Sequence, residues 1–366
     1  MAETGPTVND KTDTKTRSAT VKEVALEAGV SVMTVSRVIN GSINVKSANR
    51  ESVERAIKKV NYRPHIGARA LSGSQTYQFL MMYNNPNVAW MGELIIGMMN
   101  HCRKIGYHLL IEGFEDFEDQ ATHTINVDEI TGLIDRSLVD GIILPPPICF
   151  ERTVLDAVRA QNIPCVRIAG TPVQGINLRV GIDNCAATYE ITDHLVSLGH
   201  KNIAIVKGPE LFVASALRYE GFAAAMRYHG LEIRDSNVAT GNFDVESGIE
   251  CARKLLRQEH RPTAIFASND EMAAGVLFAA QEAGIRVPDQ LSVAGFDDAA
   301  IAHSVWPKLT TVRQPLRAMG EKSVELLESH VRQANAQSPE PLQSNIQMDY
   351  ELVVRASTGN CPQDTS

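Results

Sequence analysis

The sequence predicts a small all-α domain followed by an α/β body of two doubly wound parallel-sheet lobes. Residues 19–63 repeat apolar side chains at helical spacing and contain no strand-like run. From residue 77 onward, short apolar runs alternate with amphipathic segments, the βαβα pattern of parallel sheets covered by helices on both faces. The chain of 366 residues holds more than eight such runs, which favours two lobes over one sheet.

The N-terminal region begins with a polar tail and then a first helix. Residues 1–18 are rich in Thr, Lys and Asp without periodicity, so we expect a disordered tail. Thr20 and Glu23 form the T-x-x-E capping box that predicts a helix start. Gly29 ends this helix after about two turns.

Two further helices complete the small domain. Ser31 is expected to cap a second helix over Val32–Ile39, which Asn40-Gly41 stops. Ser47 is expected to cap a third helix that ends before Pro64. Residues 64–73 are short, weakly helical and flanked by breakers, so we expect them to order only when something packs on them.

The body then alternates between strand-like and helical segments. The strand-like runs are 77–82, 108–112, 141–144, 164–169, 180–182, 203–207, 264–267, 292–295 and 350–355. The helical segments are 92–105, 125–137, 153–160, 186–198, 215–229, 247–258, 271–283 and 317–328.

Composition excludes several protein classes. The longest uncharged apolar stretches, such as 141–150, fall well short of the roughly 20 residues of a membrane helix. The N-terminus has no apolar core segment, so we expect no secretory signal, no membrane partner and a cytoplasmic location. The six cysteines form no CxxC pair and no zinc-type cluster, so we expect reduced thiols and no metal or cofactor.

Charge is distributed unevenly along the chain. Residues 20–75 hold nine Lys/Arg and four Asp/Glu, although the whole chain carries a net charge of −8. A small basic module therefore precedes an acidic body, which fits a short segment that contacts a polyanion.

The second helix presents a face suited to the major groove of DNA. Val32 and Met33 can contact base edges or thymine methyls, and Arg37 can bind guanine O6 and N7 bidentately. The hydroxyls of Ser31, Thr34 and Ser36 can bind phosphates. Further candidate DNA contacts are Thr20, Asn40, Asn44, Asn49 and Tyr62. Two short helices joined at Gly29 thus predict a helix-turn-helix; the alternative is a generic helical hairpin with a solvated face.

These residues also match a known family. The chain carries A-T-V-K-E-V-A-x-x-A-G-V-S-x-x-T-V-S-R-V-I-N-G and then V-x-x-x-x-R-x-x-V-x-x-A-I-x-x-x-N-Y-R-P-H-x-x-A-R-A-L. Both motifs resemble the lactose-repressor (LacI/GalR-type) family of bacterial transcription regulators. The resemblance runs from about Ala19 to Thr358 and implies a periplasmic-binding-protein-like body. We expect a first lobe at about 76–178 and 314–342, a second at about 179–313 and 343–358, and a tail at 359–366.

The resemblance gives residues 64–75 a role as a hinge helix and linker. In this family a pair of such helices, one from each subunit, enters the minor groove of the operator. A Leu wedges into the central base step; Leu71 occupies that position here, with Ala68 beside it. An apolar wedge of this kind unstacks a base step and recovers the cost in contacts. The alternative is a linker Leu packed on the body.

The resemblance also implies effector-binding residues in the second lobe. Arg218 lies in the S-x-x-R-x-x-G-F signature, Asn269 in the N-D pair, and Asp297 in G-F-D-D. Gln314 belongs to the crossover strand LTTVRQP, and Phe243 falls where the family places an aromatic against a sugar ring. Asn269 and Asp297 also follow strands, where open α/β sheets bind ligands.

The first lobe offers Asn84 and Trp90 after its first strand, from where they can close the cleft. Each of these polar residues has a plainer alternative as a helix cap or turn residue, and Asp297-Asp298 as a cap-and-turn pair. Ala169-Gly170 departs from the pattern, because several sugar-binding relatives carry an Asp there. The C-terminal tail lacks the heptad Leu repeat that joins dimers into tetramers. The resemblance implies a homodimer whose surface includes helix 92–105.

The leading hypothesis is therefore a repressor of carbohydrate-utilisation genes that binds a near-palindromic operator and responds to a small sugar between its lobes. A solute-binding sensor without direct DNA control is the alternative. An enzyme is not expected, because the sequence has no G-x-G-x-x-G after the first body strand, no P-loop, no G-x-S-x-G and no HExxH.

Overall fold

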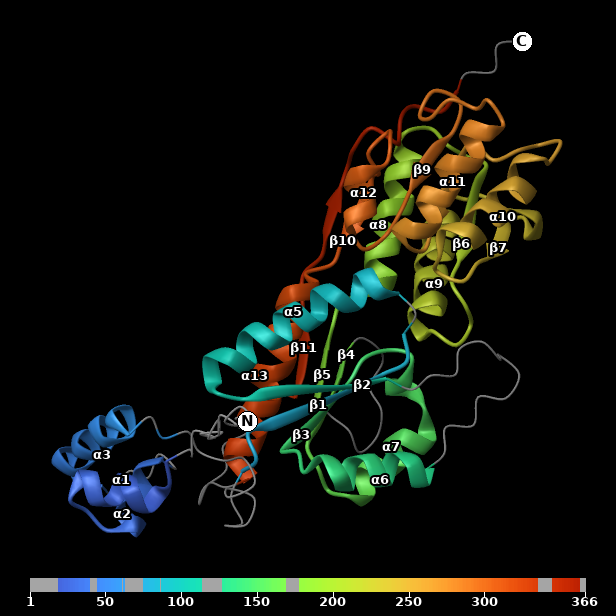
Figure 1. The fold of residues 1–366 in the computed structure, drawn as a ribbon. Helices are drawn as coiled ribbons and strands as arrows, with labels where there is room; N and C mark the ends of the chain where they lie inside the picture. Colours follow the sequence, from blue (N-terminus) through green and yellow to red (C-terminus); the bar gives the residue numbers. More distant parts are fainter. Residues whose placement is uncertain are drawn as a thin grey trace, which may run out of the picture. The chain divides into compact units, whose positions relative to one another are not determined.

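The computed structural model describes residues 19–39, 45–60, 62, 75–85, 87–113, 127–168, 178–334 and 344–362. The chain divides into two units, Met1–Thr76 and Tyr77–Ser366. Figure 1 shows the helices labelled α1, α2 and α3 in the first unit and alternating strands and helices in the second.

The first unit contains α1 (Val21–Ala28), α2 (Val32–Ile39) and α3 (Ser47–Lys59). The capping box predicted at its start is confirmed: Thr20 N–H donates to Glu23 Oε2 at 2.6 Å, and Glu23 N–H donates to Thr20 Oγ1 at 3.4 Å. Gly29 ends α1 with a φ of 68°, a conformation that glycine adopts without steric cost.

Each of the three helices contributes apolar residues to the core of this unit. Val24, Val35 and Val53 are fully buried and pack in one cluster. The prediction that Ser47 caps α3 is wrong: Ser47 is the first helical residue, and Lys46 at the cap position makes no side-chain cap bond. The carbonyl of Lys46 accepts the N–H groups of Asn49 and Arg50 instead.

The body's first lobe is built on a six-stranded parallel sheet with the order β11-β5-β4-β3-β1-β2. Its strands are β1 (Gln78–Tyr83), β2 (His108–Gly113), β3 (Gly141–Leu144), β4 (Cys165–Ile168), β5 (Leu178–Gly181) and β11 (Asn345–Gln347). Its helices are α5 (Val88–Ile105), α6 (Val127–Ser137), α7 (Arg152–Ala160) and α13 (Leu316–Ala334).

The second lobe is built on a four-stranded parallel sheet with the order β7-β6-β8-β9. Its strands are β6 (Ile203–Lys207), β7 (Val238–Thr240), β8 (Ala264–Ala267) and β9 (Ser292–Ala294). Its helices are α8 (Asn184–Ser197), α9 (Val213–Tyr228), α10 (Val245–Leu256), α11 (Asp270–Glu282) and α12 (Ala300–Ser304).

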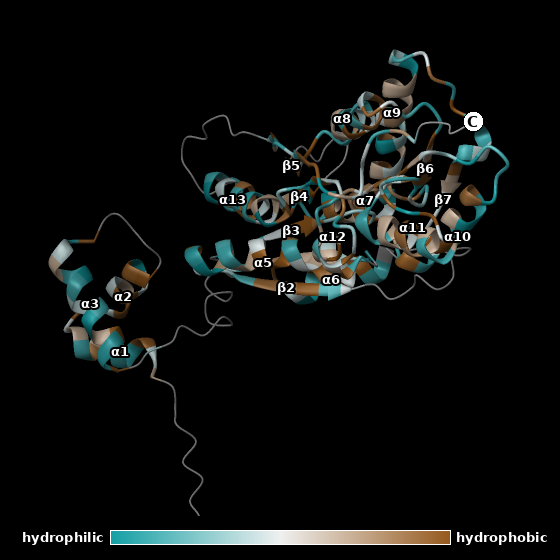
Figure 2. Cartoon of the chain, turned by 90° about the horizontal axis from the view of Figure 1, so that it is seen from above, coloured by the Kyte–Doolittle hydropathy of each residue, from teal (hydrophilic) through white to brown (hydrophobic). Residues whose placement is uncertain are grey.

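Both sheets are covered on two faces, as the alternation of side chains along each strand requires. In β1, Phe79 and Met81 pack in the cluster of α5 and α13, whereas Leu80 and Met82 pack in the cluster of α6 and α7. In β6, Ile205 faces α8 and α9, whereas Val206 faces α10 and α11. The doubly wound architecture predicted for the body is confirmed, and Figure 2 shows α13 with both hydrophobic and hydrophilic residues, as expected for a helix covering one sheet face.

Two short strands link the lobes outside both sheets. β10 (Thr311–Arg313) and β12 (Glu351–Val353) pair antiparallel, and we call this pair the crossover ribbon. The sheet pairing differs from the lobe bounds predicted from the sequence. It places residues 179–181 of β5 and all of β11 in the first-lobe sheet, where the sequence pattern placed them in the second lobe.

Within the described parts of the chain, none of the helices has the length and apolarity that crossing a membrane demands. The described residues include all six cysteines, four of them buried, and no disulfide joins any two of them.

Candidate functional site

Two parts of the chain contain the residues that the sequence singled out, and the first is α2. Val32 and Met33 are 46% and 64% exposed, and Ser36 and Arg37 are exposed as well. Val35 and Val38 are buried on the opposite face. Figure 2 shows hydrophobic colour on α2, whereas α3 is more hydrophilic. An exposed helical face with two large apolar side chains and an Arg is unusual for solvent contact but complementary to base edges.

The hydroxyls at the start of α2 are already engaged with one another. Ser31 Oγ accepts the N–H of Thr34 at 3.2 Å and lies 2.9 Å from Thr34 Oγ1. Ser31 therefore caps α2, as predicted. This cap holds the first turn of α2 in place and leaves the outward residues free to contact another molecule.

The remaining predicted DNA contacts of this unit differ in how far they are exposed to solvent. Thr20 is exposed, with its hydroxyl 3.0 Å from Glu23 Oε2; Asn49 is half-buried in α3; and Tyr62 is buried in the core of the unit. Four further predicted contacts, Asn40, Asn44, Ala68 and Leu71, lie outside the described residues, as do residues 64–74 of the hinge and linker expected over 64–75.

The second part is a cleft between the two lobes of the body. It encloses about 450 Å³ not occupied by protein atoms, part of it open to solvent. Its walls follow the carboxyl ends of β1, β3, β6, β7 and β9, where parallel sheets bind ligands. The lining residues are Asn85, Asn87, Trp90, Pro146, Asn184, Phe212, Ala214, Arg218, Phe243, Asp297 and Gln314.

Two hydrogen bonds and a cation–π contact hold the Arg218 side chain in this interlobe cleft. Its Nε donates to Asn184 Oδ1 at 2.9 Å, and its Nη1 donates to the carbonyl of Ser268. Its guanidinium carbon lies 3.7 Å from the ring centroid of Phe296, within cation–π distance. Burial lowers the pKa of Arg218 from its ordinary value, opposed by the charge of Asp297. The guanidinium is thus oriented before any ligand arrives.

Asp297 and Gln314 form a polar pair from two different segments. Gln314 Nε2 donates to Asp297 Oδ1 at 2.6 Å, and Arg218 Nη2 lies 3.6 Å from the same oxygen. Burial raises the pKa of Asp297 to about 6, partly offset by Arg218 and by the bond from Gln314. The backbone φ of Asp297 is 112°, a strained conformation that costs about 1–3 kcal/mol and persists where surrounding contacts demand it.

Aromatic rings complete the walls of the cleft. Trp90 lies in the first turn of α5, where its N–H donates to the cap residue Asn87 at 3.0 Å. Phe243 packs edge-to-face against Phe212, with ring centroids 5.1 Å apart. A cleft that combines flat aromatic surfaces with an Arg, an amide and a carboxylate is suited to a small ligand with several hydroxyl groups.

The prediction for Asn84 needs correction. Asn84 does not line the cleft; its successor Asn85 does, with its Nδ2 donating to the carbonyl of Pro146 at 2.9 Å and its Oδ1 accepting the N–H of Asn87 at 2.9 Å. The reason is local geometry: successive side chains at a strand end point in opposite directions, so an error of one residue selects the wrong face.

The prediction for Asn269 also needs correction. Asn269 is buried and caps α11, because its Oδ1 accepts the N–H of Met272 at 3.0 Å. Its Nδ2 donates to the carbonyl of Phe243 and to Glu271 Oε2, each at 2.9 Å. Asn269 does not line the cleft, but it holds Phe243 there, with a φ of 64°.

Several cleft residues were missed from the sequence. Asn87, Asn184 and Phe212 all line the cleft but belong to no quoted motif. A signal existed for two of them, because Asn87 and Asn184 follow strands β1 and β5 and lie at helix starts. Among the described residues, no three His, Cys, Asp or Glu side chains are grouped so as to hold a metal ion.

Comparison with known proteins gives consistent matches. A family model described as bacterial regulatory proteins, lacI family, matches residues 20–65, and a periplasmic binding protein-like domain model matches residues 192–358. Catabolite control protein A of Priestia megaterium is 32% identical over 342 residues, covering 93% of this chain and 99% of the relative. The ribose operon repressor of Escherichia coli K12 is 33% identical over 344 residues, covering 93% and 99%.

A solved structure shows the same similarity in three dimensions. The lac repressor dimer bound to operator and the anti-inducer ONPF has a TM-score of 0.75 to this chain at 26% sequence identity. The match covers 94% of this chain and 100% of that chain. The similarity therefore extends over both units and is not limited to the α/β body.

Proposed function

This chain belongs to the LacI family of bacterial regulatory proteins, and we propose that it represses carbohydrate-utilisation genes under the control of a small sugar bound between its lobes. The resemblance stated from the sequence motifs is thereby confirmed. Family membership makes the chain a DNA-binding transcriptional repressor with effector control. The identity of the effector class is the part that we propose.

The residues that line the cleft support a sugar as the effector. Arg218, Asp297 and Gln314 offer fixed donors and acceptors within one pocket, and Trp90 and Phe243 supply apolar ring surfaces. A sugar presents hydroxyls that both donate and accept, together with a C–H face that packs on aromatic rings. Two of the matched relatives support regulation of metabolism: one is named for catabolite control and the other for the ribose operon.

We assign DNA contacts to the exposed face of α2. In this proposal Val32, Met33 and Arg37 read base edges, while Ser31, Thr34 and Ser36 lie near phosphates. Thr20, Asn40, Asn44, Asn49 and Tyr62 are further contacts, and Ala68 and Leu71 enter the minor groove.

A homodimer on a near-palindromic operator is the assembly that this arrangement requires, because two identical helix-turn-helix units read two half-sites. The related lac repressor is a dimer in its operator complex. Helix α5 is the proposed dimer surface, where Ile96 and Met99 are exposed apolar residues. We place the protein in the cytoplasm with the chromosome, and we propose no catalytic step, cofactor or membrane partner.

The decisive experiment selects operators for the purified full-length protein from a randomised palindromic DNA library at fixed salt concentration. The selection is repeated with a panel of mono- and disaccharides that includes ribose. We expect one palindrome to be enriched and its affinity to change with one sugar. Sugar binding without any selected DNA would overturn the repressor and leave a solute-binding sensor. Selected DNA without a response to any sugar would overturn the effector class.

A further inference from the structure

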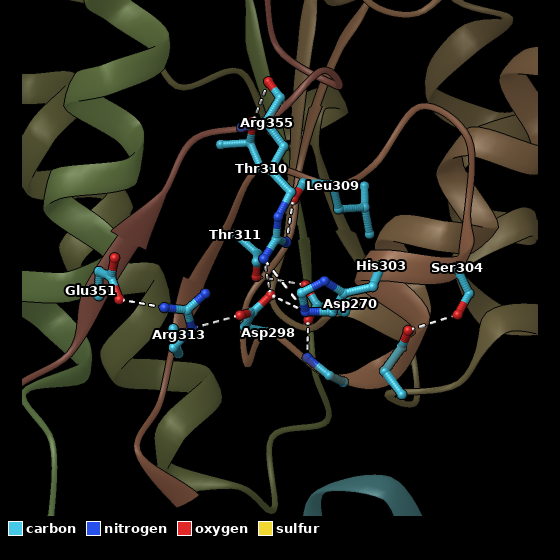
Figure 3. A network of polar contacts seen from close by, with 12 residues as sticks. Asp270, Asp298, His303, Ser304, Leu309, Thr310, Thr311, Arg313, Glu351 and Arg355 are labelled. Carbon is cyan, nitrogen blue, oxygen red and sulfur yellow. Dashed lines mark hydrogen bonds and ion pairs between the residues drawn. The ribbon is translucent and has the colours of Figure 1, made fainter.

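Asp297 and Asp298, two adjacent residues of the loop after β9, contact different side chains. Asp297 contacts Gln314 and Arg218 in the cleft. Asp298, whose side chain is only 4% exposed, instead accepts Arg313 Nε on Oδ2 at 2.7 Å and Arg355 Nη2 on Oδ1 at 2.6 Å, and His303 Nε2 lies 3.1 Å from Oδ1. Figure 3 shows Arg313 and Arg355 approaching Asp298 from separate segments, with His303 close by.

These contacts involve both strands of the crossover ribbon. Arg313 is the last residue of β10, and it also binds Glu351, the first residue of β12, at 2.5 Å. Arg355 follows β12 by two residues, and its Nη1 donates to the carbonyl of Leu309, just before β10. Asp298 therefore reaches both ribbon strands through two arginines.

A second buried carboxylate fixes the same region. Asp270, at the start of α11, accepts Thr311 Oγ1 on Oδ1 at 2.6 Å and the N–H of Ala299 on Oδ2 at 2.7 Å. Thr311 belongs to β10, and Ala299 follows Asp298 directly. The side-chain contacts of Asp270 and Asp298 thus attach the ribbon to the second lobe at several points (Figure 3).

The ribbon reaches the first lobe through very short segments. Only residues 314–315 separate β10 from α13, and only residues 348–350 separate β11 from β12. Residues 182–183, between β5 and α8, form a third connection between the lobes. Any rotation of one lobe against the other must therefore be absorbed near the residues of these three segments if the ribbon moves with the second lobe. Gln314, which lines the cleft, is one of them.

We propose that Asp298 is a positioning residue that locks the crossover ribbon to the second lobe, so that the lobes pivot at residues 182–183, 314–315 and 348–350, beside the cleft. A ligand that engages Asp297 and Gln314 then acts directly on the pivot. The attachment of the ribbon by Asp298 is a property of the fold alone. Its effect on DNA release rests on the proposed function.

The primary test is amide hydrogen exchange of the full-length protein, read by mass spectrometry, for wild type and Asp298→Asn. Loss of a buried, charge-assisted contact predicts about 10- to 100-fold faster exchange in β10 and β12, with β6 and β8 unchanged. Arg313→Gln should quicken the same amides, and adding it to Asp298→Asn should add little. Asp289→Asn, which breaks an exposed ion pair with Arg286 in the same lobe, is the matched control and should change nothing in the ribbon.

Two results would overturn the proposal. Unchanged ribbon exchange in Asp298→Asn would show that the contacts of Asp298 hold nothing in place. Equal acceleration throughout the second lobe would show a general structural role instead of a local lock.

A second readout uses the sugar and the operator that the library selection yields. Asp298→Asn should bind that sugar within about threefold of wild type, because Asp297 and Gln314 remain. The change in DNA affinity caused by the sugar should shrink by about 2- to 30-fold. If wild type responds to no sugar, the proposed function fails while the exchange result on the ribbon stands by itself.

Discussion

Asn269 Nδ2 donates to Glu271 Oε2 at 2.9 Å at the start of α11 in the second lobe. The same nitrogen donates to the carbonyl of Phe243, a residue of the cleft wall, at 2.9 Å. The Glu271 carboxylate is therefore joined through Asn269 to the wall of the cleft.

The burial of Glu271 predicts a pH-dependent stability. Burial first, and the charge of Asp297 second, raise the pKa of Glu271 from 4.5 to about 7. Between these pH values the folded state binds more protons than the unfolded state, so stability falls as pH rises from 4.5 to 7. The penalty is complete above pH 7 and absent below pH 4.5.

Glu271→Gln removes that penalty while keeping an acceptor for Asn269. We expect the variant to match wild type at pH 4.5 and to be about 1–3 kcal/mol more stable at pH 8. Urea unfolding at both pH values measures this difference. Asp297, whose pKa is also raised, is present in both proteins, so its contribution cancels in the comparison. A variant less stable than wild type at pH 8 would contradict the assignment of the raised pKa to Glu271.

A conservative change at Arg218 should separate effector binding from DNA binding. Arg218→Lys keeps the positive charge but loses the planar fork that contacts Asn184 and Ser268. We expect sugar affinity to fall about 10- to 100-fold, with operator affinity unchanged and no longer responsive to the sugar. Isothermal titration and DNA titration provide the two values. Arg227→Lys, at an exposed position of the same helix, is the control and should bind sugar normally.

Local signals allowed much of the fold to be predicted. Helix α2 has the bounds Val32–Ile39 that its flanking residues indicated, because caps and turns act over a few residues. The alternation of strands and helices in the body followed from hydrophobic patterning in the same way. The pairing of β11 with β5 was beyond such reasoning, since it joins segments more than 150 residues apart.

The candidate site was predictable only in part. Arg218, Phe243, Asp297, Gln314 and Trp90 line one cleft, as predicted from the sequence. Asn84 failed because side-chain direction at the end of β1 depends on register, which the sequence does not show. Asn269 failed because its polar atoms are all used within the protein, a question that only the three-dimensional contacts answer.

The cap role of Asn269 predicts a loss of stability that an effector contact would not produce. Asn269→Ala removes the cap of α11 and the bond to the Phe243 carbonyl. We expect the free energy of unfolding to fall by about 1–3 kcal/mol in the absence of any ligand. Urea denaturation gives this value directly, and Asn242→Ala, at an exposed neighbouring position, should leave stability within about 0.5 kcal/mol. Unchanged stability of Asn269→Ala would return this residue to the list of candidate ligand contacts.

Arg37 provides the sharpest prediction for DNA recognition. It lies exposed in the last turn of α2, on the face that also carries Val32 and Met33. Neither of those apolar residues can hydrogen-bond a base, so Arg37 should carry most of the direct readout by this helix. Arg37→Ala is therefore expected to lower affinity for the selected operator by about 1–3 kcal/mol more than affinity for random DNA. Competition titrations at one salt concentration measure both affinities, with Arg152→Ala, an exposed Arg of the body, as the control for the lost charge. Equal losses on operator and random DNA would make Arg37 a phosphate contact and transfer sequence recognition to other residues.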